Sequence, residues 1–173
     1  MIMMKHSIPS AGKTAALSGA VAALYVVLTM FSRLAGLDSG VIQLRFSEAL
    51  TVLPFFLPGT VPGLFIGCLL SNLLAGCLPL DIAIGSGATL LGALGTAWLG
   101  RKKAPLWTAP IPPVLCNTAL IPPVLAYVYH ASGALPVFFL TVFAGEFLSC
   151  FVLGLLLAGL LRPVISRNPK NLF

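Results

Sequence analysis

Glu146 stands near the middle of an otherwise apolar stretch that runs from Leu135 to Leu161. An ionised side chain in hydrocarbon costs about 3 kcal/mol or more, so such a group is paired, protonated or part of a solute pathway. We interpret Glu146 as the floor of a binding site. The alternative is a protonated Glu146 that hydrogen-bonds to a neighbouring helix.

The other acidic residues are Asp38, Glu48 and Asp81, and all three fall in or beside segments expected on the outer side of a membrane. Acids that gather on one side and at mid-depth create a field that attracts a cation or a solute rich in hydrogen-bond donors. We therefore predict a pocket that opens outward. Exclusion of acids from the inner leaflet is the competing explanation, above all for Asp38.

Two asparagines add amide groups to this set. Asn117 lies between two diproline steps, Pro112-Pro113 and Pro122-Pro123, which remove backbone donors on both sides of a polar side chain. Broken helices of this kind often line solute sites. A plain proline kink, with Asn117 bonded to a freed carbonyl, is equally compatible with the pattern, and Asn72 has the same ambiguity.

The composition defines the elements that must position these groups. Of 173 residues, 58% are hydrophobic and 8% are charged, and the mean hydropathy is +1.04. Soluble domains carry about 25% charged residues, so this chain is an integral membrane protein. We predict an all-α fold, a compact bundle of six transmembrane helices that forms a single domain over residues 1–173.

Proline, glycine and charged residues divide the sequence into six apolar segments. These are residues 14–33, 48–57, 60–76, 82–100, 108–129 and 135–161. The second segment is short, because a helix needs about 20 residues to cross the hydrocarbon core. Either the preceding loop dips inward or the turn at Leu57-Pro58-Gly59 lies inside the protein.

The basic residues set the expected orientation, because they gather on the cytoplasmic side. A cytoplasmic N-terminal segment (1–13) and a cytoplasmic tail (162–173) place most of them inside. These are Lys5, Lys13, Arg101, Lys102, Lys103, Arg162, Arg167 and Lys170. Only Arg33 and Arg45 then face outward. This bias accounts for the net charge of +6 without a nucleic-acid partner.

Motifs for catalysis, nucleotide binding and metal binding are not found. Gly12-Lys13-Thr14 ends like a phosphate loop, but Ser7 stands where the first glycine is required. Cys68, Cys77, Cys116 and Cys150 form no CxxC pair and have no histidine at metal-ligand spacing, so we interpret them as packing residues. We predict no enzyme activity, no cofactor and no metal.

Small residues recur on the first apolar segment at spacings that let helices approach closely. They form more than one face, and we expect one of these faces to contact a partner protein.

The segment from Ile42 to Leu50, IQLRFSEAL, resembles the QueT-type family of queuosine-precursor transporters. The similarity continues through Pro54-Phe55-Phe56 and Pro62–Cys68 to Asn72. Residues 22–29 and Gly145-Glu146 are similar as well, so the resemblance extends over about residues 15–161. Its most specific part is the Arg-x-Ser-Glu pattern at Arg45, Ser47 and Glu48.

The resemblance implies the substrate-binding S component of an energy-coupling factor (ECF) importer in a prokaryotic cell membrane. Such a subunit captures its ligand from outside and works with a transmembrane coupling subunit and two ATPase subunits, which hydrolyse the ATP. The resemblance also implies that a small-residue face of the first helix meets the coupling subunit, and the matching residues are Ala16, Gly19, Ala20 and Ala23. The alternatives are an S component for a different vitamin and a membrane scaffold subunit that binds no solute.

A queuosine precursor is a 7-deazaguanine, whose base edge presents adjacent N–H donors. Either Glu146 or Glu48 is expected to bind that edge, and the other acid would meet an aminomethyl cation if the ligand carries one. The remaining expected substrate-binding residues are Arg45, Asn72, Asn117, Asp81, Gln43 and Phe46. Phe46, Phe55 and Tyr25 are candidates to stack on the ring. Arg45 can instead pair with Glu48 three residues on.

Overall fold

The computed structural model describes residues 11–37 and 43–167. Asp38 lies outside this range, as do most of the predicted cytoplasmic N-terminal segment and the end of the tail. The prediction that places Asp38 near the outer mouth therefore stays a prediction.

The described residues form six α-helices and no β-strand. The α-helices are α1 (Ala11–Leu34), α2 (Val61–Leu74), α3 (Pro79–Arg101), α4 (Ile111–Tyr127), α5 (Leu135–Glu146) and α6 (Leu155–Arg167). These residues also form three 3₁₀-helices, η1 (Phe46–Phe55), η2 (Pro58–Thr60) and η3 (Leu106–Thr108). A π-helix, η4 (Phe147–Gly154), joins α5 to α6.

Each apolar segment predicted from the sequence is helical in the structure. Four helical stretches are long and apolar enough to cross a membrane: Ala11–Leu34, Pro79–Arg101, Leu106–Tyr127 and Leu135–Pro163. The other two, Phe46–Phe55 and Pro58–Leu74, are shorter. The all-α membrane fold is thus confirmed, whereas the count of six crossings and the cytoplasmic side of the termini stay predictions.

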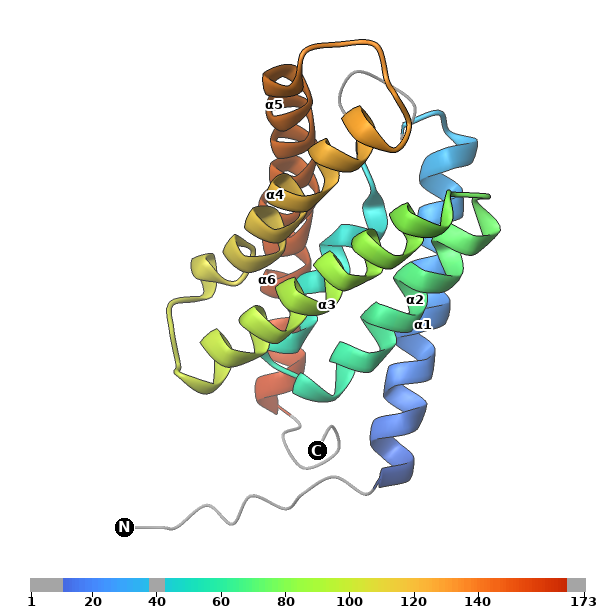
Figure 1. Cartoon of the computed structure of the whole chain (residues 1–173). Coiled ribbons are helices and arrows are strands. Elements are labelled where there is room, and N and C mark those ends of the chain that lie inside the picture. The colour runs from blue at the N-terminus through green and yellow to red at the C-terminus, as the bar shows by residue number, and fades with distance from the viewer. Residues whose placement is uncertain (1–10, 38–42, 168–173) are drawn as a thin grey trace.

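Consecutive helices pack side by side, α1 on α2, α2 on α3, α3 on α4 and α4 on α5. The α5–η4–α6 stretch forms one long column beside α4, and η1 lies in the interior behind α3 (Figure 1). The first residue of α1 and the last turn of α6 lie at the same end of the bundle (Figure 1). η1 packs against α1, α3, η4 and α6, and it is therefore the element around which the bundle is built.

The 3₁₀ geometry of η1 compensates for the shortness of the predicted second segment. A 3₁₀-helix rises about 2.0 Å per residue, against about 1.5 Å for an α-helix, so the same residues reach farther. Most of η1 is buried, including Ser47, Glu48 and Thr51. Leu57 and Thr60 are buried as well, whereas Pro58 and Gly59 between them are partly exposed, so this turn is only partly covered by the protein.

Helix α4 continues without interruption through Pro122 and Pro123. Pro112 and Pro113 occupy its first turn, where the missing N–H groups have no intrahelical partner in any case. Of the two alternatives for Asn117, the broken helix is therefore excluded by the structure. Asn117 sits on a continuous helix and turns its buried side chain inward.

Glycines allow the closest helix contacts. A Cβ at Gly63 would collide with the backbone carbonyl of Ser18 in α1, and a Cβ at Gly92 would lie 2.7 Å from Cα of Pro113 in α4. Because the obstructing atoms belong to the backbone, they cannot rotate away. These contacts bring α1 to α2 and α3 to α4, as small residues do in membrane bundles.

Replacing Gly92 by alanine should force α3 and α4 apart. Overpacking of this kind costs about 1–3 kcal/mol, so we expect a clear drop in the melting temperature of the purified protein in detergent. The matched control is Gly87→Ala in the same helix, where a Cβ would meet nothing within 4 Å. Equal melting temperatures for the two variants would contradict the close contact at Gly92.

Candidate functional site

A small cavity lies where η1, α2, α3, α4 and α5 meet. Its volume is about 20 Å³, which is room for about one water molecule. Its walls are Gln43, Arg45, Glu48, Cys68, Gly85, Thr89, Asn117, Ile121, Val142 and Glu146. In this structure the site is therefore nearly closed, and a larger solute requires its walls to move.

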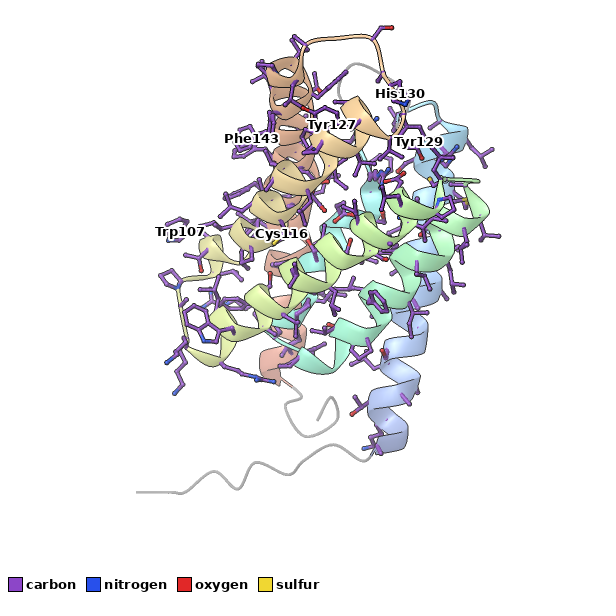
Figure 2. All side chains as sticks on the ribbon, in the orientation of Figure 1. Trp107, Cys116, Tyr127, Tyr129, His130 and Phe143 are labelled. Atoms are coloured by element: carbon purple, nitrogen blue, oxygen red, sulfur yellow. The ribbon has the colours of Figure 1, made fainter. Side chains whose placement is uncertain are left out.

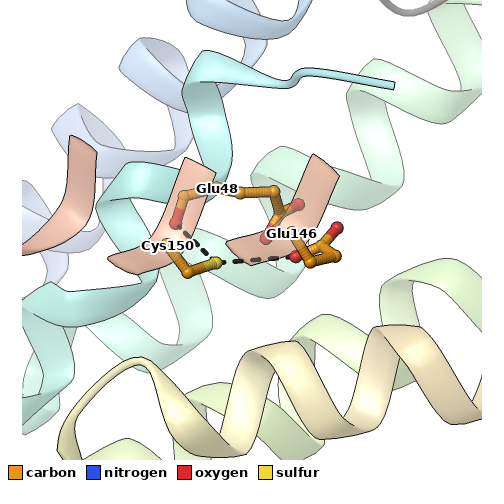
Figure 3. A group of neighbouring side chains, drawn as sticks. All are labelled: Glu48, Glu146 and Cys150. Atoms are coloured by element: carbon orange, nitrogen blue, oxygen red, sulfur yellow. Dashed lines mark hydrogen bonds between the residues drawn. The ribbon is translucent and has the colours of Figure 1, made fainter. Parts of the chain in front are cut away.

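Two carboxylates meet at this cavity from distant parts of the sequence. Glu48 belongs to the first turn of η1, and Glu146 is the last residue of α5. An oxygen of each carboxylate and the Sγ atom of Cys150 all lie within 4.8 Å of one another. Figure 3 shows this group, with Cys150 below Glu48 and the two carboxylates facing each other.

The Glu48 carboxylate is almost fully buried and receives few hydrogen bonds. Its side chain is 2% exposed. The Tyr25 hydroxyl in α1 donates to Oε1, whereas Oε2 is buried without a hydrogen-bond partner. A buried acceptor that lacks a donor costs about 1–3 kcal/mol. The site is thus short of donors, and a ligand that brings donors would relieve this cost.

The Cys150 thiol connects η4 to both acids. It lies 3.5 Å from Oε2 of Glu146 and 3.6 Å from the backbone carbonyl oxygen of Glu48 (Figure 3). The Thr51 hydroxyl lies 3.6 Å from the same sulfur and donates to the Glu48 carbonyl at 2.6 Å. These contacts hold the base of the carboxylate pair in place.

Arg45 supplies the positive charge of the site, since it lines the same cavity and its charge interacts favourably with those of Glu48 and Glu146. Over the described ranges, however, no ion pair joins it to either carboxylate. The pairing of Arg45 with Glu48 expected from their spacing is therefore not formed. A metal ion would fit the spacing of the carboxylates and Cys150, but we assign none, because a divalent cation would face the charge of Arg45.

The segment that carries Gln43 and Arg45 is held by backbone contacts. The Arg45 N–H donates to the Ser149 hydroxyl at 3.3 Å, and the Phe46 N–H donates to the Ser32 hydroxyl at 3.0 Å. A Cβ at Gly145 would collide with the backbone carbonyl of Gln43. The glycine next to Glu146 thus lets this segment lie directly on α5.

The π-helix η4 begins immediately after Glu146. Its wider turn changes the direction of the side chains that follow, among them Ser149 and Cys150, which face η1. Segments of this geometry are rare and occur frequently at functional sites. The sequence predicts a regular helix over residues 135–161, so this irregularity was not anticipated.

Of the eight predicted substrate-binding residues, five meet at the cavity: Glu146, Glu48, Arg45, Asn117 and Gln43. Asn117 is 4% exposed, and its amide lies near both carboxylates. Their binding role itself stays a prediction, but the structure places all five around one space.

The other three predicted residues lie elsewhere. The Asn72 amide contacts the sulfur of Cys68 at 3.6 Å and packs behind Gly85, outside the lining. Phe46 packs on Phe31, with 5.9 Å between the ring centroids.

Asp81 accepts a hydrogen bond of 2.8 Å from Tyr129, whose oxygen also accepts from the Leu78 N–H at 3.2 Å. Figure 2 shows Tyr129 beside His130 at the end of the bundle, on the chain that follows α4. Partial burial raises the pKa of Tyr129 to about 12, so the phenol keeps its proton at neutral pH. These hydrogen bonds link the chain after α4, which carries Tyr129, to Leu78 before α3 and to Asp81 in the first turn of α3.

None of the expected stacking aromatics lines the cavity. Tyr25 is 1% exposed and directed at Glu48, and Phe55 packs edge-on against Phe56. The apolar walls are Ile121 and Val142 instead. Sequence reasoning also missed Cys68, Gly85, Thr89 and Cys150. Only Cys150 had a local signal, since it lies four residues after Glu146, the spacing of one helix face.

The small-residue face of α1 is not used for packing within the described chain. Ala16, Gly19, Ala20 and Ala23 are all exposed. A Cβ at Gly19 would meet nothing within 4 Å, in contrast to the crowded glycines of α2 and α3.

Apolar helices surround a small cavity lined by two carboxylates, Arg45 and side-chain amides, and ionisable groups in such a place are typical of membrane proteins that handle a solute. A family model described as QueT transporter matches residues 15–163. Because this match covers most of the sequence, the chain belongs to the QueT transporter family. Its helical stretches that are long and apolar enough to cross a membrane make it a multi-pass membrane protein.

A curated relative supports this membership. The chain is 39% identical over 84 residues to the queuosine precursor transporter QueT of Lactococcus lactis subsp. cremoris (strain MG1363). The aligned part is 48% of this chain and 49% of that protein, so the chain spans about half the length of the relative. No solved structure is significantly similar to this chain.

Replacing Tyr25 by phenylalanine should leave both oxygens of Glu48 without a donor from α1. We expect the free energy of unfolding to fall by about 1–3 kcal/mol, measured by thermal unfolding in detergent. Tyr127→Phe is the control, because Tyr127 is 70% exposed. A melting temperature unchanged by Tyr25→Phe would show that this hydrogen bond does not support the carboxylate.

Proposed function

We propose that this protein binds a queuosine precursor of the 7-deazaguanine class from outside the cell and is the S component of an ECF-type importer. The observation that carries this proposal is the pair formed by the buried Glu48 and the half-buried Glu146 at one cavity, with an acceptor oxygen of Glu48 that lacks a donor. Family membership and the name of the Lactococcus relative support the same ligand class.

The chemistry of a 7-deazaguanine complements this cavity. The base carries several N–H donors, and the cavity offers carboxylate oxygens and the side-chain amides of Asn117 and Gln43 as acceptors. Charge-assisted hydrogen bonds are about twice as strong as neutral ones. Arg45 and the amide N–H groups can meet the carbonyl oxygen of the base, and Ile121 and Val142 provide apolar surface for the flat ring.

Uptake in this proposal requires partner proteins, namely a transmembrane coupling subunit and two ATPase subunits in a prokaryotic plasma membrane. The exposed small-residue face of α1 is the proposed contact with the coupling subunit. Close packing against a partner helix explains why small side chains occupy a surface that no helix of the described chain covers.

Replacing Glu146 by glutamine should weaken binding of the precursor. Loss of a charge-assisted hydrogen bond costs about 1.5–3 kcal/mol, which corresponds to roughly a tenfold to hundredfold rise in Kd. Binding is measured by thermal stabilisation of the purified protein with 7-cyano-7-deazaguanine, its aminomethyl form and queuine, beside thiamine, riboflavin and biotin.

Asp81→Asn is the matched control, because it neutralises a carboxylate outside the cavity and should bind as the parent does. If Glu146→Gln binds as tightly as the parent protein, the proposed site is wrong. Stabilisation by another vitamin would overturn the ligand class, and stabilisation by none of these compounds would favour a scaffold subunit.

Replacing Gly19 by leucine should block the coupling subunit without changing ligand binding. We expect ligand-induced stabilisation to persist, while uptake of labelled precursor by cells that also produce the coupling subunit and the ATPases falls at least tenfold. Gly159→Leu in α6 is the control, because a Cβ at this exposed glycine also meets nothing within 4 Å. Equal uptake by the two variants would remove the proposed contact from this face.

A further inference from the structure

We propose that Glu48 and Glu146 hold one proton between them when the site is empty, and that the primary ammonium group of an aminomethyl-7-deazaguanine takes its place. This inference rests on the proposed function and refines it, because it names the form of the precursor that the site selects. Binding of the cation then releases a proton to the outer solution.

The charges at the site favour a single shared proton. Two ionised carboxylates so close together repel each other strongly where little water is present, and pairs of this kind usually share a proton. Arg45 offsets one negative charge. One further positive charge, a proton or a monovalent cation, then makes the site neutral.

The position of the two carboxylates favours an ammonium group over the base edge as their shared partner. Their oxygens lie side by side, so they converge on one group of the ligand and do not reach opposite ends of a fused ring. The planar edge of the base offers adjacent donors that a single carboxylate accepts, which leaves the second carboxylate without a partner. An ammonium group has three donors directed to different sides and can serve both acids.

One carboxylate oxygen of Glu48 lacks a donor that an ammonium group could supply. Oε2 of Glu48 is buried and receives no hydrogen bond, while Tyr25 already serves Oε1 of the same carboxylate. An ammonium hydrogen directed at Oε2 would satisfy this atom. The base edge would then face the amides of Asn117 and Gln43, which line the same cavity.

The other ionisable groups at the site are weaker sources of an exchangeable proton. Tyr25 from α1, Cys68 from α2 and Cys150 from η4 are buried and neutral groups, and Arg45 before η1 stays charged. The lining residues of α3 and α4, among them Thr89 and Asn117, do not titrate. Within the described residues, the proton that a cation displaces therefore comes from the carboxyl pair.

The test is isothermal titration calorimetry of the purified full-length protein in lipid nanodiscs with 7-aminomethyl-7-deazaguanine. Titrations at pH 7 in phosphate and in Tris, which differ in their heats of ionisation, count the protons released. The ligand amine, like that of lysine, is already protonated at this pH and takes up none. We expect about one proton to be released per ligand bound. The Kd should therefore increase as the pH is lowered, by up to about tenfold for each pH unit.

Two comparisons make the result specific. The neutral 7-cyano-7-deazaguanine should bind more weakly and show the same heat in both buffers. Glu48→Gln, checked for folding by thermal unfolding, should bind the aminomethyl compound without releasing a proton. If this variant does not fold, the count of protons released by the unmodified protein still tests the exchange.

The outcomes separate this inference from the proposed function. Tight binding of the aminomethyl compound without proton release, or equal affinity for the cyano compound, would overturn the exchange and leave the 7-deazaguanine transporter in place. Binding of neither compound in either buffer would overturn the proposed function itself.

Discussion

The placement of two carboxylates within an apolar bundle, Glu48 buried and Glu146 half-buried, is the constraint on which the rest of this structure depends. Glu48 and Glu146 lie where an isolated charge is costly, and the protein supplies only a few partners: the Tyr25 hydroxyl, the Cys150 thiol, the Asn117 amide and the more distant charge of Arg45. Such groups persist in a membrane protein when a function requires them, and in the proposed function the requirement is a ligand that provides donors or positive charge.

The irregular helices of the fold follow from this site. A 3₁₀-helix carries Glu48 into the interior, and a π-helix begins directly after Glu146 and turns Ser149 and Cys150 toward η1. Regular α-helices would direct these side chains differently. The glycines allow close backbone contacts. Gly63 and Gly92 let helix backbones come together, and Gly145 leaves room for the backbone of Gln43 beside Glu146. Close packing therefore both stabilises the bundle and defines the walls of the cavity.

The surface of α1 differs from this interior. Its buried side contributes Val21 and Tyr25 to the core, while its other side presents exposed alanines and Gly19, where a Cβ would meet nothing within 4 Å. One helix thus serves two purposes. It holds the donor that supports Glu48, and it exposes a smooth face on which another membrane helix can pack.

The sequence alone determined that this is an all-helical membrane protein, because a composition with so few charges cannot form a soluble domain, and it placed each apolar segment on a helix. It also singled out Glu146, since one acid in an apolar stretch is conspicuous without any structure. Only the tertiary structure decided which residues share the cavity. Glu48 and Glu146 are neighbours through packing, Asp81 is bonded to Tyr129 away from the cavity, and Cys68 and Thr89 line it. Such contacts depend on helix phase and on the 3₁₀ and π geometry of two segments, and local sequence carries little information about either.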